Sequence, residues 1–581
     1  MFEHEQMKQH IIFVICCILL QLAFGLCLAS SKPQITYKIT GTTDDIYKNI
    51  QERLRVISQQ FPDTIDKAEL ERILAQSEKE VLLAIQPFGY FHPRISQGIK
   101  KENNTIILEF GIHLGPPMRI QSVTISLMGE GKSNQAMQSA LNNIIPLKAG
   151  EIFTSKAYND TQTLLFSLAR RHGYIKANLA QHEIRMNTDK NTADITLSLD
   201  TGPRFYYGPI TFTPSPYNSS FLARFVSFQQ TQPYSSVDIQ TLQETLSNSK
   251  YFSSATVNPQ VDQADSQYAV PITIDTQAVK AQQYNFGLGY GTNTGTRTSI
   301  GMDLYRMTDT GQHLSTLLNL STVNTSLSAK YYIPGPQPAI NQYTTGFYLG
   351  QFSPDAGKAF TKKLSTGYET KLNSHWDISS NLNLLTERFS IDNAPYHTTD
   401  LIYPSIYLSR LSADNTINPE QGSRFTLEVS SSPPGVETEF VQTELTGKWM
   451  YPPSPYQFLI VRGDIGVIYA SDYENTFPLS MRYFAGGYGS VRGYSYQSMG
   501  PGKYLKVVSA EIQQRIVGDF FLGLFVDAGT ATNDLTQPLE RGIGIDFIYR
   551  TSVGPLSISI AQANTQPDKP IRIEFNFGTN L

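Results

Sequence analysis

The 581-residue chain is poor in several residue types, and each shortage excludes a class of protein. All three of its cysteines, Cys16, Cys17 and Cys27, lie close together near the start of the sequence. The rest of the chain therefore offers no disulfide, no thiolate metal ligand and no cysteine nucleophile. Charged residues make up only 17% of the sequence and the formal net charge is −4, whereas nucleic-acid binding needs an excess of positive charge. We therefore expect no nucleic-acid partner.

Patterns for catalysis are absent as well. The sequence has no His-Glu-x-x-His pair and no Gly-x-Ser-x-Gly elbow, and its nine histidines are scattered. We therefore expect neither an enzyme active site nor a cofactor or metal site.

One long apolar run, from Ile11 to Leu28, precedes a polar chain. Small residues follow the run, so we expect residues 1–29 to be a secretory signal peptide that is cleaved near Ala29. A permanent membrane anchor is the alternative, because the run is about as long as a short spanning helix requires.

A similar segment then occurs in three copies, at 32–115, 116–202 and 203–280. Short runs mark the copies: GYFHPRI from Gly89, GYIKANL from Gly173 and KYFSSATV from Lys250. Each run follows apolar residues at helical spacing and precedes two strand-like runs. We predict three tandem α+β domains, each with the order strand, helix, helix, strand, strand. Their exposed sheet edges suit the docking of an extended peptide, and the alternative is that they act only as spacers.

Residues 281–581 replace the helical pattern with segments in which apolar and polar side chains alternate. In FFLGLFVDAG, for example, Phe520, Leu524 and Val526 fall on one face and Asp527 on the other. We place sixteen strands, with starts near 283, 297, 313, 324, 342, 359, 376, 400, 422, 439, 457, 504, 520, 542, 555 and 571. An even number of strands with an apolar outer face and a polar inner face predicts a membrane-spanning antiparallel β-barrel. A soluble β-sandwich also alternates, but its strands are usually shorter.

The longest connection between these strands, residues 471–503, contains AGGYGSVRGYSYQSMGP. A phosphate-binding loop needs a strand before it and a helix after it, but strand-like segments lie on both sides here.

The tandem repeats, the sixteen strands and FAGGYGSVRGYSYQSMGP together resemble the outer-membrane assembly family typified by BamA and TamA. The repeats resemble that family's polypeptide-transport-associated (POTRA) domains, and three copies fit the TamA branch. The sharpest likeness is Val491-Arg492-Gly493-Tyr494, which is similar to the family's Val-Arg-Gly-Tyr/Phe motif in the sixth extracellular loop. The resemblance implies a bacterial outer-membrane barrel with its POTRA-like domains in the periplasm.

The resemblance also implies that the loop folds into the barrel lumen, where Arg492 meets acidic residues of the twelfth and thirteenth strands. Alternation independently places Glu511 and Asp527 on the lumenal side, although Arg515 shares that side and would compete for Glu511. We therefore predict a lock formed by Arg492, Glu511 and Asp527. The alternative is a mobile surface loop with an exposed arginine.

The family mechanism implies a seam between the first and last strands. Residues assigned to the seam are Gly287, Gly289 and Gly291, which weaken packing of the first strand, and Phe575, Phe577 and Gly578 in the last. The resemblance implies insertion of unfolded outer-membrane clients such as autotransporters, contact with outer-membrane lipids, and docking of a TamB-like, inner-membrane-anchored partner by the first repeat. The alternatives are a secretion pore of the two-partner type and a phospholipid-transport component scaffolded by the repeats.

Overall fold

The computed structural model describes residues 34–58, 66–102, 105–144, 146–291, 295–415, 418–552 and 554–577. The expected signal peptide and Gly578 of the predicted seam lie outside these residues. The chain divides into two compact units, the first containing the residues up to Pro209 together with 230–237 and 261–270, and the second containing the rest. No helix among the described residues is both long enough and apolar enough to cross a membrane.

The first repeat has the predicted order of elements. It comprises β1 (Gln34–Thr40), α2 (Asp44–Ser58), α3 (Lys67–Ile85), β2 (Arg94–Glu102) and β3 (Thr105–His113). Asp66 caps α3 by accepting a hydrogen bond from the backbone N–H of Glu69 at 2.7 Å, which satisfies one of the free donors at the helix start. Sheet order is β1-β3-β2, with β1 parallel to β3, so β2 is an edge strand.

The other two repeats follow the same plan. The second comprises β4 (Arg119–Met128), α4 (Gln135–Ile144), α5 (Ser155–Arg171), β5 (Asn178–Asn187) and β6 (Thr192–Asp200), and its sheet order is β4-β6-β5. The third comprises β7 (Tyr206–Phe212), α6 (Ser219–Ala223), α7 (Ser236–Ser247), β8 (Phe252–Pro259) and β9 (Ala269–Ala278), and its sheet order is β7-β9-β8. The central strand of each sheet carries the most deeply buried apolar row, because it has neighbours on both sides.

The first residue of the short run that marks each repeat is not the same in all three copies: it is Gly89, Gly173 and Lys250. Gly89 and Gly173 have φ values of +87° and +91°, which L side chains rarely adopt, and a Cβ on Gly89 would lie 2.3 Å from the carbonyl oxygen of Phe153 in the next repeat. These glycines therefore allow one repeat to pack closely against the next. The third copy has Lys250 at this position, and its side chain reaches barrel residues instead: its Nζ lies 3.4 Å from Oε1 of Gln342.

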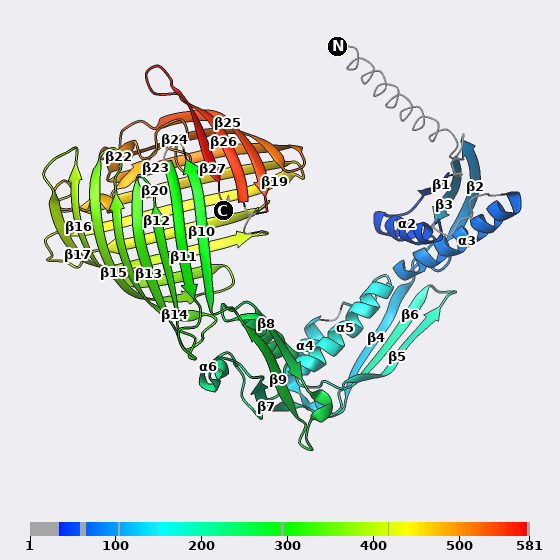
Figure 1. The fold of residues 1–581 in the computed structure, drawn as a ribbon. Helices are drawn as coiled ribbons and strands as arrows, with labels where there is room; N and C mark the ends of the chain where they lie inside the picture. The colour runs from blue at the N-terminus through cyan, green and yellow to red at the C-terminus, as the bar shows by residue number, and fades with distance from the viewer. Residues whose placement is uncertain are drawn as a thin grey trace, which may run out of the picture. The chain divides into compact units, whose positions relative to one another are not determined.

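The remaining strands form one 16-stranded antiparallel sheet that curls into a barrel (Figure 1), which confirms the predicted number. Its strands, in order, are β10 (Gln282–Gly291), β11 (Gly295–Leu304), β12 (His313–Leu320), β13 (Asn324–Pro334), β14 (Asn341–Phe352), β15 (Gly357–Lys371), β16 (Trp376–Ile391), β17 (His397–Ala413), β18 (Gly422–Ser431), β19 (Phe440–Ser454), β20 (Gln457–Ala470), β23 (Tyr504–Val517), β24 (Phe520–Thr532), β25 (Glu540–Thr551), β26 (Gly554–Ala563) and β27 (Ile571–Phe577).

The two faces of the barrel wall differ as the alternation predicts. On β24, Leu524 and Val526 are exposed on the outer surface, whereas Phe525 and Asp527 between them are buried. The long connection between β20 and β23 carries the short helix η4 (Leu479–Met481) and the two-stranded ribbon of β21 (Tyr483–Ala485) and β22 (Met499–Gly502). This connection holds Arg492 of the predicted lock, whereas Glu511 lies on β23 and Asp527 on β24.

Candidate functional site

The loop between β21 and β22 folds back into the barrel. Its residues Val491, Arg492 and Tyr494 are each at most 3% exposed, which contradicts the alternative of a mobile surface loop. Gly493 has a φ of +91°, and a Cβ there would lie 2.9 Å from the carbonyl carbon of Gln562 on β26. Glycine at this position therefore lets the loop backbone approach the barrel wall closely.

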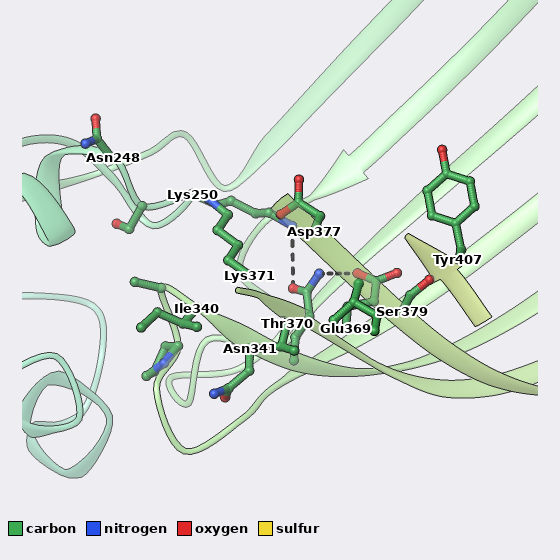
Figure 2. A pocket seen from close by; sticks show the side chains of 15 residues that line it. Asn248, Lys250, Ile340, Asn341, Glu369, Thr370, Lys371, Asp377, Ser379 and Tyr407 are labelled. Atoms are coloured by element: carbon green, nitrogen blue, oxygen red, sulfur yellow. Dashed lines mark hydrogen bonds between the residues drawn. The ribbon is translucent and has the colours of Figure 1, made fainter. Parts of the chain in front are cut away.

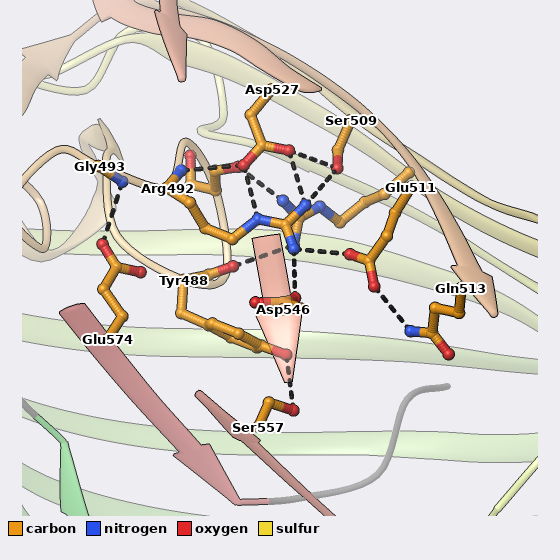
Figure 3. Close-up of polar contacts among 12 residues, drawn as sticks. Tyr488, Arg492, Gly493, Ser509, Glu511, Gln513, Asp527, Asp546, Ser557 and Glu574 are labelled. Carbon is orange, nitrogen blue, oxygen red and sulfur yellow. Dashed lines mark hydrogen bonds and ion pairs between the residues drawn. The ribbon is translucent and has the colours of Figure 1, made fainter. Parts of the chain in front are cut away.

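The structure brings Arg492 together with both predicted carboxylates (Figure 3). Its Nε and Nη2 donate to the two carboxylate oxygens of Asp527 at 2.8 and 2.9 Å, a bidentate pair that lysine cannot form. Its Nη1 donates to Oε2 of Glu511 at 2.6 Å, and its backbone N–H donates to Asp527 at 3.0 Å. Both the side chain and the backbone of Arg492 are therefore fixed to the wall.

A third carboxylate, Asp546 on β25, belongs to the same cluster. It accepts from Nη1 of Arg492 at 2.8 Å and is fully buried. Its other oxygen, Oδ1, does not bond the arginine, and Ser559 of β26 lies directly opposite Asp546 in the sheet. In GIGIDFIY, Asp546 alternates with Ile545 and Phe547 and so belongs to the lumenal row of its strand, but no sequence pattern indicates how far the arginine reaches.

The cluster holds more negative than positive charge. Arg492 forms ion pairs with Glu511, Asp527 and Asp546, so one guanidinium faces three carboxylates in a buried site. Burial acts to lower the pKa of Arg492, but the carboxylates outweigh it and raise that pKa above its ordinary value. The ring centroid of Phe525 lies 3.4 Å from Cζ of Arg492 and covers one face of the guanidinium.

The predicted competitor, Arg515, does not contact Glu511. Its Nη2 donates instead to Oε1 of Glu420 at 3.0 Å. Nη1 of Arg550 lies 3.7 Å from the same oxygen. Both arginines stack over Phe521, with Cζ 5.1 and 4.1 Å from the ring centroid. Glu420 lies between β17 and β18, far from Arg515 in sequence, so strand alternation could not reveal this pairing.

The loop also reaches the last two strands of the sheet. The backbone N–H of Gly493 donates to Oε1 of Glu574 on β27 at 3.2 Å. The hydroxyl of Tyr488 bonds Ser557 on β26 at 3.1 Å, and that of Tyr494 donates to Glu540 at 2.9 Å. The lock is thus tied directly to the strand that borders the predicted seam.

The seam strands β10 and β27 lie at the two ends of the sheet order. Residues 282–291 of β10 and 571–577 of β27 show no backbone pairing with each other. Every other pair of neighbouring strands in the sheet is paired along the backbone. Gly287, Gly289 and Gly291 lie on β10 as predicted, and Phe286 and Leu288 beside them are 77% and 81% exposed. Phe575 and Phe577 on β27 also point outward.

A second polar cluster surrounds Lys250. This residue of the third repeat belongs to the same compact unit as the barrel. Gln342 donates to Glu369 at 2.6 Å, and Glu369 also pairs with Lys330. A cavity of about 350 Å³ opens beside this network (Figure 2). Its lining includes Lys371 and Asp377, which lie directly opposite each other on β15 and β16.

The barrel and the repeats match known families. Residues 279–581 match the Omp85 superfamily domain, and this is more than half of the chain. The chain belongs to the Omp85 superfamily. Residues 36–113 match the POTRA domain described as TamA domain 1, and residues 119–202 match a POTRA family described as a surface antigen variable number repeat. This Omp85 protein is therefore an outer-membrane β-barrel with periplasmic POTRA domains, in a superfamily of assembly and secretion factors.

Two relatives illustrate the likeness. The outer membrane protein assembly factor BamA of Neisseria meningitidis serogroup B is 21% identical over 596 residues, which span 88% of this chain and 73% of that protein. The crystal structure of BamA from Haemophilus ducreyi lacking POTRA domains 1–3 has a TM-score of 0.64 at 17% identity and covers 79% of this chain and 99% of that one. The second comparison concerns the fold alone.

Proposed function

We propose that this Omp85 protein inserts β-barrel clients such as autotransporters into the outer membrane through the seam between β10 and β27. The observation that carries the proposal is the difference between this boundary and every other strand boundary. The facing edges of β10 and β27 have no shared backbone register in the described residues, so their N–H and C=O groups are available to a client strand. No catalytic step is required, and we propose that the protein is not an enzyme.

The periplasmic repeats supply the second half of the proposal. The first repeat matches a TamA-type POTRA domain and presents β2 as an edge strand. We propose that this repeat docks a TamB-like periplasmic protein anchored in the inner membrane. Lys100→Pro in β2 of the full-length protein should then reduce co-purification of that partner, while the edge-strand control Arg185→Pro in β5 should not.

A crosslink tests the seam. Cysteines are introduced at Leu288 and Ile573, both exposed on the outer face of the two seam strands, and the protein is treated with bifunctional reagents of increasing length until the pair is joined. Insertion of an autotransporter client should stop when this pair is joined, because β10 and β27 can no longer separate. The matched control is Ile300→Cys with Leu318→Cys, which lie directly opposite each other on β11 and β12. Normal insertion by the joined seam variant would refute the proposal.

Two other functions use the same parts. A secretion pore of the two-partner type would pass clients through the lumen, and the loop deep inside the barrel argues against a permanently open channel. The other alternative is phospholipid transport scaffolded by the repeats. In that case the seam crosslink would stop lipid movement between the membranes and would leave client insertion unaffected.

A further inference from the structure

The loop is held to the barrel at two separate places. Its tip, residues 486–498, carries the Arg492 lock, and its stem, residues 473–481, lies against different strands. We infer that Glu387 on β16 is a second positioning residue, which keeps the stem across the lumen when the tip is released. The inference rests on the proposed function, because it explains how the seam could open without opening a pore.

Glu387 is a buried carboxylate that faces the lumen and is 0% exposed. Its Oε1 accepts from the backbone N–H of Ser480 at 3.0 Å, and its Oε2 accepts from Oγ1 of Thr361 at 2.7 Å. A carboxylate is costly to bury unless hydrogen bonds compensate it. One of those bonds comes from the loop, so displacing the stem would leave Glu387 with less compensation.

Two further hydrogen bonds fasten the stem to neighbouring strands. Oγ1 of Thr399 on β17 donates to the carbonyl of Thr476 at 2.6 Å. Nε2 of Gln442 on β19 donates to the carbonyl of Met481 at 2.9 Å. Leu479, which lies between these points, is fully buried against Ala359 and Phe389.

The stem also has its own internal support. Arg482, immediately after the stem, is 5% exposed and donates to the carbonyl oxygens of Tyr473, Glu474 and Phe477. Its guanidinium lies 4.3 Å from the ring centroid of Tyr473. These contacts close the stem into a compact turn, so Glu387 holds a folded unit rather than an extended chain.

The two anchorages use different parts of the wall. The stem packs on β15 and bonds to β16, β17 and β19, whereas the tip bonds to β20 and to β23 through β27. Asn533 donates to Glu474 across a long 3.5 Å contact, and Tyr473 and Phe477 of the stem share a buried apolar cluster with Val491 and Tyr494 of the tip. Glu387 and Arg492 share no hydrogen-bond partner among the described residues, so release of Arg492 leaves the bonds to Glu387 intact.

Single-channel conductance of the purified full-length protein in planar bilayers tests the inference. Glu387→Ala should raise the conductance severalfold. Glu387→Gln should stay near wild type, because its amide oxygen still accepts from the N–H of Ser480 and its amide nitrogen can donate to the hydroxyl oxygen of Thr361. Arg492→Ala should also stay near wild type, because the stem still covers the lumen. The double variant Glu387→Ala with Arg492→Ala should conduct most. Glu444→Ala is the control. Glu444 is also a lumen-facing carboxylate, on β19, but among the described residues it forms no hydrogen bond with the loop.

Folding is checked by heat-modifiable mobility on gels. If Glu387→Ala does not fold, Ser480→Pro removes the N–H donor while keeping the carboxylate, and it should raise conductance in the same way. A folded Glu387→Ala or Ser480→Pro protein with wild-type conductance would overturn the inference, as would a fully open Arg492→Ala pore. Neither outcome depends on client insertion, so failure of the seam crosslink to block insertion would refute only the proposed function.

Discussion

The tip and the stem of the loop are both buried, but different forces hold them. The tip depends on one guanidinium and three carboxylates, whereas the stem depends on backbone carbonyls, aromatic packing and a single carboxylate. Removing one member of a buried ionic cluster leaves uncompensated charge behind, so such a cluster is either complete or very unfavourable. At the stem, Glu387 is the one wall carboxylate that accepts from the loop among the described residues, and the other wall contacts are neutral hydrogen bonds and apolar packing, each of which is less costly to lose. The tip is therefore the part suited to release and the stem the part suited to persist.

The largest effect is expected from removing Arg492, the only cation among the described residues that forms ion pairs with Glu511, Asp527 and Asp546. Arg492→Ala should lower the free energy of unfolding by about 3–5 kcal/mol, because three buried carboxylates lose their common partner. Urea unfolding of the purified barrel measures the change. The exposed Arg388→Ala on β16 is the control and should differ little from wild type.

The carboxylates of the lock are not equivalent, and a matched pair of variants should reveal this. Asp527→Asn should cost about 2 kcal/mol, because Asp527 accepts the bidentate bonds and the backbone N–H of Arg492. Asp546→Asn should cost clearly less, because it removes surplus negative charge and keeps an acceptor oxygen. Equal losses of stability in the two variants would contradict the charge imbalance described above.

A smaller effect is expected where the tip meets the last strand. Glu574→Gln weakens the charge-assisted bond from the N–H of Gly493 and should cost about 1 kcal/mol. The local effect should exceed the global one, with faster amide hydrogen exchange in 571–577 than in the paired strand β24. Unchanged exchange in β27 would mean that the tip does not restrain the seam strand.

The smallest effect is expected at the opposite end of the lumen. Glu420→Gln should cost only about 0.2–1 kcal/mol, because the Glu420 side chain is half exposed and solvent screens its pairing with Arg515. The loss should shrink further as salt is raised in the unfolding buffer. A loss as large as that of Arg492→Ala would remove the distinction between buried and exposed charge clusters in this barrel.

Strand alternation predicted much of the barrel because its period is two and each wall position has only two possible directions. It gave the sixteen strands, with starts within three residues of those observed, and it placed Glu511 and Asp527 on the lumenal side. The same alternation puts Asp546 of GIGIDFIY and Glu574 of IRIEFNFG on the polar side of their strands. Which of these carboxylates meet the loop depends on how deep the loop descends, and no local pattern encodes that depth.

Contacts made across the lumen could not be predicted from the sequence either, because no local pattern encodes them. Glu387 and Ser480 are 93 residues apart, and Glu420 and Arg515 are 95 residues apart. Each pairing depends on barrel closure and on the path of a connecting segment, rather than on the period of any strand. The family motif around Arg492 pointed to a lock, but it gave no indication of the stem.

The third repeat has a consequence for how such an array of domains can lengthen. Gly89 and Gly173 accept a following repeat at close range, whereas Lys250 in the third copy contacts the barrel. The first two copies thus carry a glycine that admits a following repeat, whereas the third carries a lysine that contacts the barrel. A repeat with glycine at this position can be followed by another repeat, but the repeat with Lys250 has to be the last one before the barrel.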